Sequence, residues 1–325
     1  MTENSTSAGR FIIELKVDST KPIDIVGLGV CTLDLLKRVD EFPAQEGVQL
    51  AEESALQGGG PVSTALAAAA KLGAKTQLID RLGDDWRGDL IFRELQELGV
   101  GIEHVSRATG QSSCIASVWV RKRDGGRCIA FTPGSVPEFG ADELPAGVVE
   151  SAKILHTNGR HGAAMFEAAR RARNSGTLVS FDGGAGRFRE QLLEFLPLVD
   201  IAIVAREFAE NLAGTAEIQT AAESIRALGP KLVGITDGLA GSWIFPPDAV
   251  DFHQPAFAVE DTIDTTGCGD VYHGAFLTGL AKNWTLEKCA ELASAVAALN
   301  SRGLGGRGNL VSLAEAAEFT GRSAF

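Results

Sequence analysis

Short apolar runs alternate with amphipathic segments through the first third of the chain. Residues 22–30 form a β-branched run that ends in glycine, which predicts a buried strand. Small and apolar residues fill 61–73, which predicts a helix packed closely against a sheet. The next strand is predicted at 76–83, and an amphipathic helix that ends at a glycine at 89–99.

The second half of the chain repeats this alternation with short connections. Such alternation favours parallel strands covered by helices. Strands are predicted at 153–159, 177–183, 199–205 and 231–238, and helices at 165–176, near 187–195 and at 216–228.

Two segments do not fit the alternating series. Residues 112–134 place two strand-like runs around Asp124, Gly125 and Gly126, which indicates a hairpin. Residues 48–60 mix polar and apolar side chains and predict a partly exposed strand. We expect the hairpin to stand apart from the main sheet as a small β appendage.

Composition excludes several classes of partner. The 325 residues carry a net charge of −12, so long-range attraction to nucleic acid or to an anionic membrane is not expected, and an anionic ligand must be held by local geometry. The longest alanine-rich run is far too short to span a bilayer. The odd number of cysteines, without a CxxC pair, favours a reducing cytoplasm over a disulfide framework or a zinc site; they are Cys31, Cys114, Cys128, Cys268 and Cys289.

The most informative stretch is DTTGCGD, residues 264–270, which runs directly into the apolar segment VYHGAFLTGLA. Gly267 and Gly269 let the backbone turn tightly where a helix is predicted to begin, near Asp270. Successive backbone N–H groups at a helix start form a concave, partly positive site for phosphate. The alternative interpretation is a plain strand-to-helix turn with Asp264 as the N-cap.

This stretch carries a family resemblance. DTTGCGDVYHGAF resembles the C-terminal signature of the PfkB carbohydrate kinases, the ribokinase-like family, whose usual form is DTxGAGDxFxxGF. A second stretch, GGPVSTALAAAAKLGAKTQLIDRLGDDWRGD at 59–89, is similar to the N-terminal signature GGxxANxAxxxARLGxxxxxxGxxGxDxxG. The two signatures span most of the chain in the family's order.

The resemblance implies a fold and an activity. The fold is a three-layer α/β/α sandwich with a mostly parallel, doubly wound sheet, forming one kinase domain over 1–325, with a small β-sheet lid made by about 34–58 and 112–134. The activity is ATP-dependent phosphorylation of a hydroxyl group on a sugar or sugar derivative. The resemblance also implies a homodimer that pairs through the lid strands.

Catalytic roles are carried over onto the turn. Asp270 would take the proton from the substrate hydroxyl as general base. The N–H groups of Gly267, Cys268 and Gly269 would bind the charge that develops on the transferred phosphoryl group. Cys268 stands where the family usually has Ala, and we interpret it as a packing residue because the backbone N–H is the working group.

Substrate contacts are carried over onto the first strands and a later loop. Asp34 matches an early Asp that accepts hydrogen bonds from substrate hydroxyls, with a helix cap as the alternative. Gly59 and Gly60 match the diglycine where the lid meets the core. Thr64 stands where the family usually has Asn and reaches less far, which leaves the substrate preference open. Arg160, in a predicted strand-end loop, is a candidate for binding an anionic group of the substrate.

The segment TDGLAGS resembles the family's TxGxxG segment beside ATP, with Thr236, Gly238 and Gly241 at the matching positions. The alternative is a plain strand-turn-strand. Asp264 and Thr265, at the start of the late turn, are further candidates for the nucleotide side, with Asp264 fixing the turn or its ion environment.

The metal site is the least complete part of the resemblance. The family's NxxE motif should fall at 205–208, but Ala205 and Phe208 occupy its two polar positions, and only Glu207 lies close. The resemblance implies Mg²⁺ with ATP and adds a monovalent cation as a candidate. Here Mg²⁺ would be held mainly through nucleotide phosphates and water, with Glu207 nearby.

Two alternative functions remain. A nucleoside kinase of the same fold would sandwich a base between apolar lid residues, for which Val118, Trp119 and Val120 are candidates. A regulator that binds a sugar or nucleotide without turnover is suggested by the missing NxxE motif and by Thr64.

Overall fold

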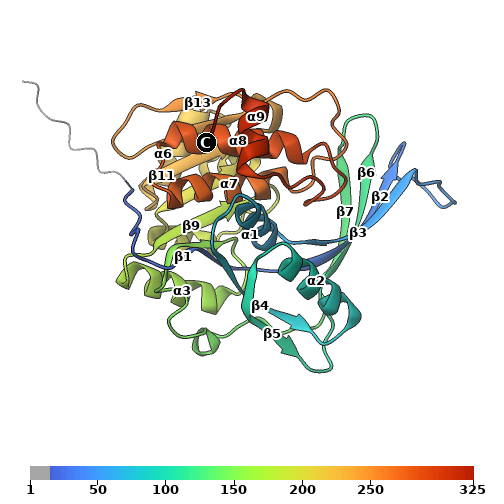
Figure 1. Cartoon of the computed structure of the whole chain (residues 1–325), viewed down its shortest axis with the longest axis horizontal. Helices are drawn as coiled ribbons and strands as arrows, with labels where there is room; N and C mark the ends of the chain where they lie inside the picture. Colours follow the sequence, from blue (N-terminus) through green and yellow to red (C-terminus); the bar gives the residue numbers. More distant parts are fainter. Residues whose placement is uncertain (1–14) are drawn as a thin grey trace, which may run out of the picture.

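The computed structural model describes residues 15–325, and its larger part is a twisted sheet covered by helices (Figure 1). Within these residues the sheet has nine strands in the order β13-β12-β11-β10-β9-β8-β1-β4-β5. Neighbours from β11 to β5 are parallel, and β12 and β13 add an antiparallel edge, so the expected mostly parallel sheet is confirmed. The strands are β1 (Ile23–Leu28), β4 (Thr76–Gly83), β5 (Gly101–Ala108), β8 (Ala152–Thr157), β9 (Leu178–Gly183), β10 (Ile201–Ala205), β11 (Leu232–Thr236), β12 (Ser242–Phe245) and β13 (Phe252–Gln254).

Helices pack on both faces of this sheet. Neighbouring strand residues supply opposite cores: Ile25 of β1 packs with one set of helices and Val26 with the other, as the two-residue period of a strand requires. In the described part of the chain, no helix combines the length and the apolar character needed to cross a bilayer. One face carries α1 (Pro61–Lys71), α2 (Trp86–Glu97), α7 (Cys268–Ala281), α8 (Leu286–Asn300) and α9 (Leu313–Thr320), and the other carries α3 (Gly162–Asn174), α4 (Leu192–Phe195), α5 (Arg206–Ala213) and α6 (Ile218–Ala227).

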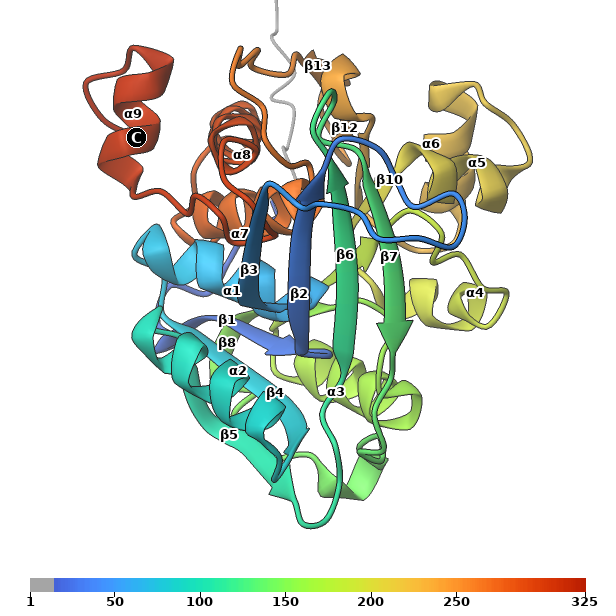
Figure 2. The same ribbon diagram turned by 90° about the vertical axis from the view of Figure 1, so that its right-hand side faces the viewer.

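A second, small sheet stands beside the main one, with strand order β3-β2-β6-β7 (Figure 2). It consists of β2 (Thr32–Val39), β3 (Glu53–Gly59), β6 (Ile115–Arg121) and β7 (Arg127–Thr132). The β6–β7 and β2–β3 pairs are antiparallel, whereas β2 and β6 are parallel. The hairpin predicted at 112–134 and its separation from the main sheet are therefore confirmed.

Several helix boundaries differ from the sequence expectation. α2 begins at Trp86 rather than near 89, because the side chain of Asp85 accepts a hydrogen bond from Gly88 N at 3.0 Å and caps the helix. The helix expected near 187–195 is reduced to α4. The segment before α4 stays irregular, and in it the side chain of Arg187 donates a hydrogen bond to Asp182 at the end of β9. Helix α5 was not predicted.

Candidate active site

The predicted anion turn lies between the main sheet and α7. Gly267 is the N-cap of α7 with φ of 71°, and a Cβ there would meet Gly306 Cα at 2.5 Å, so only glycine fits. The N–H of Cys268 bonds weakly to Thr265 O at 3.4 Å. Among residues 15–325, no protein acceptor binds the N–H of Gly267 or Gly269. The turn therefore presents two free backbone donors at a helix start.

Asp264 fixes the shape of this turn. Its side chain is fully buried, and its two oxygens accept hydrogen bonds from Thr266 N and Gly305 N, both at 2.7 Å. Because Gly267 is the N-cap, Asp264 does not cap α7, and the alternative interpretation of a simple capping role is wrong. Thr265, the next residue, donates to Gly125 O through its N–H and its hydroxyl, which docks the hairpin tip on the turn.

Asp270 lies half-buried in the first turn of α7. Burial raises the pKa of its carboxyl to about 6; Asp182 adds to the rise, while the positive charge of Arg187 opposes it. A carboxyl that titrates near 6 is ionised at neutral pH yet basic enough to accept a proton from a hydroxyl.

A polar network surrounds Asp270 that the sequence did not reveal. Burial alone would raise the pKa of Asp182 on β9, but the charges of His273 and Arg187 hold it well below its usual range. Arg187 Nη1 donates to Asp182 Oδ2 at 3.0 Å, and His273 Nε2 lies 3.4 Å from Asp182 Oδ1. The rings of His156 and His273 lie 5.2 Å apart, and burial lowers the pKa of His156 to about 3. Asp182 and Arg187 are close in the sequence, but their contact with His273 of α7 and the approach of His156 from β8 are produced by the fold.

Three residues predicted to shape the substrate site, Asp34, Gly59 and Gly60, gather where the small sheet joins the core. Asp34 on β2 is buried, accepts from Thr32 Oγ1 at 2.8 Å, and has its pKa raised by burial. Gly59 at the end of β3 has no room for a side chain, because its Cβ would collide with the Asp34 carboxylate. Gly60 follows as the residue before α1. Asp34 is a strand residue, so the helix-cap alternative is wrong.

Thr64 on α1 is also buried here, and its hydroxyl accepts a hydrogen bond from Arg307 Nε at 3.3 Å. Arg307 was not predicted as a site residue, because it lies outside both signatures. Its guanidinium fills the space beside the short Thr64 side chain.

Arg160 lies in the loop between β8 and α3. Its Nη1 pairs with Glu138 at 3.1 Å, and its Nε is buried without a partner in the described residues. The following residue, His161, has φ of 56° and is held by Asp80 at 3.0 Å and by Phe139 N at 3.1 Å. Asp80 is buried and stands where the N-terminal signature has Gly.

On the face of the small sheet that bears Asp34, β7 presents apolar side chains. By register, Phe131 lies in one row with Ala116 and Asp34, and Ile129 lies in the next row with Val118. Phe131 and Ile129 are about half exposed, at 50% and 49%.

The residues proposed for base contact, Val118, Trp119 and Val120, alternate between the two faces of β6. Val118 and Val120 are buried against Leu304, and Trp119 lies on the outer face, where it lines a hollow with the loop 41–51. The expected inner position is wrong for Trp119, because alternate side chains of a strand point to opposite faces, while base contact by Val118 and Val120 stays a prediction.

Comparison with known proteins decides the family. The model of the pfkB family carbohydrate kinases matches residues 23–311. The chain belongs to the pfkB family of carbohydrate kinases. Members of this family are phosphotransferases that act on hydroxyl groups, so the kinase fold and the kinase class expected from the two signatures are confirmed.

Relatives of this pfkB kinase include sugar and nucleoside kinases. A nucleoside kinase of Methanothermobacter thermautotrophicus is 26% identical over 90% of this chain and 94% of its own length. An ATP-dependent ribose-1-phosphate kinase of Halopiger xanaduensis is 26% identical over 88% of this chain and 94% of its own. The crystal structure of adenosine kinase from Sinorhizobium meliloti superposes with a TM-score of 0.80 at 24% identity, covering 92% of this chain and 99% of that one.

The segment TDGLAGS, predicted to lie beside ATP, begins at the end of β11. Thr236 ends the strand, a short 3₁₀ turn spans Gly238–Ala240, and Gly241 precedes β12. The side chain of Leu239 is 92% exposed. The alternative of a plain strand-turn-strand describes the local geometry correctly. It does not exclude a nucleotide, because an exposed apolar side chain at such a turn can pack against an adenine.

The family's NxxE positions have a structural explanation. Phe208 is fully buried, with its ring centroid 5.8 Å from that of Phe181 and 5.5 Å from that of Phe188. Ala205 ends β10. An alanine and a phenylalanine buried in an aromatic cluster therefore stand where the family has its polar pair. Glu207 is exposed in the first turn of α5, without a partner in the part of the chain that the structure describes.

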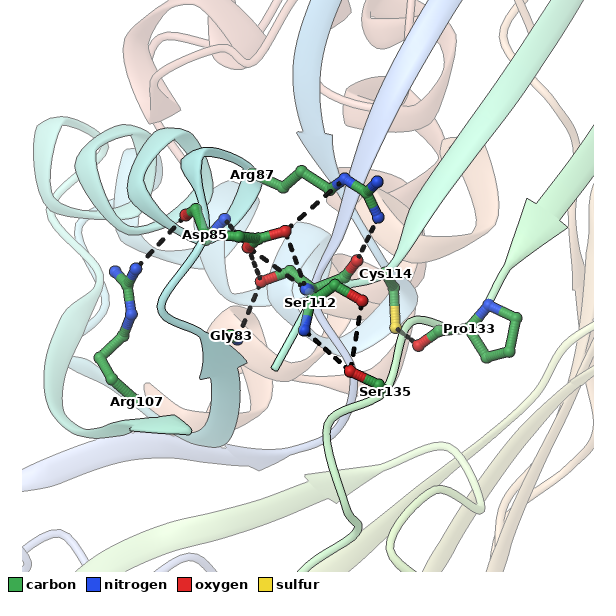
Figure 3. A network of polar contacts seen from close by, with 10 residues as sticks. Gly83, Asp85, Arg87, Arg107, Ser112, Cys114, Pro133 and Ser135 are labelled. Carbon is green, nitrogen blue, oxygen red and sulfur yellow. Dashed lines mark hydrogen bonds and ion pairs between the residues drawn. The ribbon is translucent and has the colours of Figure 1, made fainter. Parts of the chain in front are cut away.

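A polar network joins the small sheet to the main sheet (Figure 3). Asp85, the cap of α2, accepts from Ser113 Oγ at 2.9 Å, and Ser113 Oγ accepts from Gly83 N at 2.9 Å. Arg87 donates to Ser113 O at 3.1 Å, and Ser112 N donates to Ser135 Oγ at 2.9 Å. Ser113 precedes β6 and Ser135 follows β7, so this network fixes the base of the small sheet.

Proposed function

We propose that this pfkB kinase transfers the γ-phosphoryl group of ATP to a hydroxyl group of a sugar or nucleoside, with Asp270 as general base. The observation that carries the proposal is a half-buried carboxyl with a pKa of about 6 in the first turn of α7, next to the free N–H groups of Gly267 and Gly269. A base and an anion site at adjacent residues are what phosphoryl transfer requires.

In the reaction, the ionised Asp270 removes the hydroxyl proton as the oxygen attacks the γ-phosphorus. The bond from that phosphorus to the β–γ bridging oxygen breaks, and ADP leaves with the electron pair. Charge spreads over the three equatorial oxygens, where the N–H groups of Gly267 and Gly269 are placed to bind it, with Cys268 N–H once its weak bond to Thr265 opens.

Two arginines would add positive charge to this anion site. Arg187 lies close enough to lower the pKa of Asp270, and Arg127 of β7 donates to Thr265 Oγ1 at 3.3 Å. In a chain with a net charge of −12, these local cations would offset the general repulsion of ATP.

Magnesium would neutralise the phosphate charge. Among the described residues no cluster of three or more His, Cys, Asp or Glu side chains could hold a metal, so the donors present do not form a protein cage. The exposed carboxylate of Glu207 fits an ion that keeps most of its water and binds the nucleotide phosphates. A monovalent cation fits less well at Asp264, because both of its oxygens already accept backbone N–H groups.

Asp34 and Arg160 would bind the substrate, with Gly59, Gly60 and Thr64 shaping its site. The nucleotide would lie along Thr236, Gly238 and Gly241. The small sheet, about 34–58 and 112–134, would close over the substrate as a lid within a single domain of residues 1–325, and this closure would exclude water.

A nucleoside is the second candidate substrate. The half-exposed Phe131 and Ile129 form an apolar wall in the rows that begin at Asp34 and Leu36, and a sugar alone offers little apolar surface to cover it. A planar base would stack on such a wall.

We also propose a cytoplasmic homodimer. The outer face of the small sheet exposes Leu35 at 37% and Leu56 at 48%, beside a hollow of about 790 Å³ under the loop 41–51. A second copy would cover this face. Light scattering that gave a monomer mass at micromolar concentration would contradict the dimer.

The kinase proposal is tested with Mg-ATP and a panel of aldoses, ketoses, their phosphates and nucleosides. Product is identified by mass, and ADP release is measured in parallel. Asp270→Asn should lose roughly 10²- to 10⁴-fold in kcat, whereas Asp261→Asn, an exposed carboxylate nearby, should behave as the wild type. Phe131→Ala should raise KM for a nucleoside but not for a simple sugar. A wild-type enzyme that phosphorylates nothing on the panel would overturn the proposal.

A further inference from the structure

The loop between α8 and α9 contacts the anion turn closely. Gly305 N donates to Asp264 Oδ2 at 2.7 Å, and Gly306 lies so close to Gly267 that a Cβ on Gly267 would be 2.5 Å from Gly306 Cα. Asn300 Nδ2 donates to Gly306 O at 3.1 Å and fixes the loop to the end of α8. The backbone of this loop therefore packs against the anion turn and is hydrogen-bonded to it.

The next residue, Arg307, contacts the base of the small sheet. Its side chain is 1% exposed. Its N–H donates to Gln57 Oε1 at 2.9 Å, and its guanidinium donates to Gly59 O at 3.3 Å. The same guanidinium donates to Ser63 Oγ at 2.9 Å and to Thr64 Oγ1 at 3.3 Å on α1.

Glu94 of α2 completes this arrangement. One of its oxygens accepts from Arg307 Nη1 at 3.1 Å, and the other accepts from Gly58 N. By register Gln57 is the partner of Asp34, so both Glu94 and Arg307 bind the strand that lies next to the predicted substrate carboxylate. Among the described residues, Glu94 is the carboxylate paired with this buried guanidinium.

Three consecutive residues thus join the two halves of the site. Gly305 and Gly306 contact the turn that would hold the phosphoryl group, and Arg307 contacts the strand end that would hold the sugar. Transfer requires the substrate hydroxyl to lie in line with the phosphorus and within reach of Asp270, and a displacement of about 1 Å can cost roughly 10²-fold in rate.

We propose that Arg307 is a positioning residue that sets the substrate-side end of the small sheet relative to the anion turn. This inference rests on the proposed kinase function. Burial of an arginine is costly, and a well-packed apolar side chain at such a place is often neutral or stabilising, so stability alone does not account for it. The five hydrogen-bond contacts of Arg307 instead fix the position of its loop relative to β3, α1 and α2.

Arg307→Met tests this role in the reaction of Mg-ATP with the panel compound that the wild type phosphorylates fastest. The measured quantity is the ratio of ATP hydrolysed to water to phosphoryl groups transferred. This ratio should rise at least 10-fold in Arg307→Met, with transfer slowed roughly 10- to 100-fold and both KM values within about 3-fold of the wild type. An inactive fraction lowers both rates equally and leaves the ratio unchanged, so the ratio separates positioning from a loss of folded enzyme.

Arg302→Met is the matched control. Arg302 lies in the same loop, is 42% exposed and pairs with Asp261 at 2.7 Å, so its variant should keep the wild-type ratio. Arg307→Lys should restore the ratio in part, because one ammonium can replace some of the hydrogen bonds. Where Arg307→Met does not fold, Glu94→Gln removes the charge that holds Arg307 and should raise the ratio in the same direction.

The possible outcomes separate the two proposals. A wild-type enzyme that transfers phosphate to no panel compound overturns the kinase function, and the positioning role with it. A wild type that transfers normally, beside a folded Arg307→Met or Glu94→Gln variant with an unchanged ratio, overturns the positioning role alone.

Discussion

Arg187 donates a hydrogen bond to Asp182 at 3.0 Å, and its positive charge also limits the pKa of Asp270. One guanidinium therefore interacts with two carboxyl groups: it helps to keep the buried Asp182 ionised, and it limits the pKa of Asp270 to about 6. The pH dependence of kcat should therefore report the pKa of Asp270 and the effect of its charged neighbours on that pKa.

The first prediction concerns the pH profile of the wild type. Because burial raises the pKa of Asp270 to about 6, the base is protonated below that pH and ionised above it. We expect kcat to rise with pH through about 6 and to level off by about 7.5. A rise centred near 4, as for an exposed carboxyl, would contradict this assignment.

The second prediction is that two neighbouring substitutions shift this profile in opposite directions. Arg187 lowers the pKa of Asp270 and Asp182 raises it, so Arg187→Met should move the acid limb of the kcat profile to higher pH and Asp182→Asn should move it to lower pH. Shifts of the same sign in both variants would show that Asp182 acts only by holding Arg187.

The third prediction concerns stability. The pKa of Asp270 is near the ordinary aspartate value of 3.8 in the unfolded chain and about 6 in the folded protein, so folding favours its protonated form. Its ionisation therefore lowers stability as pH rises from about 4 to 6, and above pH 6 the full cost of a buried charge remains. Asp270→Asn should raise the free energy of unfolding by about 1–3 kcal/mol at pH 7.5, with no gain below pH 4.

Urea unfolding at the two pH values measures this effect. Asp261→Asn serves as the control, because Asp261 is exposed and pairs with Arg302. If Asp270→Asn were less stable than the wild type at pH 7.5, the contacts of the carboxylate in the folded state would contribute more free energy than the burial of its charge costs.

Much of the fold and part of the site could be predicted from the sequence. The sequence was sufficient for β1, α1 and β4, because each is a short apolar run buried on nearly all sides, and for the β6–β7 hairpin, because it has an Asp-Gly-Gly turn. Periodicity could not tell which face of that hairpin packs against the core, so neither the burial of Val118 and Val120 nor the outer position of Trp119 was predicted.

Long-range polar pairs were beyond sequence reasoning. Arg187 and Asp182 are close in the chain, but their relation to Asp270 follows from the position of β9 beside α7. Arg307 contacts Thr64 across 243 residues. The sequence shows Thr64 in place of the family's Asn, but it does not show that Arg307 is the hydrogen-bond partner of Thr64.

The fourth prediction uses Cys268 as a chemical reporter of the turn. Burial raises the pKa of its thiol to about 12, so alkylation at pH 8 should be slow compared with that of the exposed Cys128. Mg-ATP should slow it further, because phosphate would cover the turn, while leaving Cys128 unchanged. Mass spectrometry after timed iodoacetamide treatment measures both sites in one sample, and equal protection of the two cysteines would argue against binding at the turn.

The fifth prediction concerns the aromatic cluster at the lost NxxE position. Phe208 is fully buried and its ring contacts those of Phe181 and Phe188. Phe208→Ala should lower the free energy of unfolding by about 3–5 kcal/mol, and Phe208→Glu by more, because it also buries a charge without a partner. Restoring the family's Glu should therefore weaken the protein rather than improve Mg²⁺ binding.

Ala205→Asn is the matched control for this prediction. Position 205 is half-buried at the end of β10, where a polar side chain can reach water, so its variant should remain within about 1 kcal/mol of the wild type. Urea unfolding gives the stabilities, and the Mg²⁺ dependence of ATP turnover gives the functional effect. A Phe208→Glu variant that folds as stably as the wild type and needs less Mg²⁺ would show that the cluster is dispensable and that the family's metal site is latent in this chain.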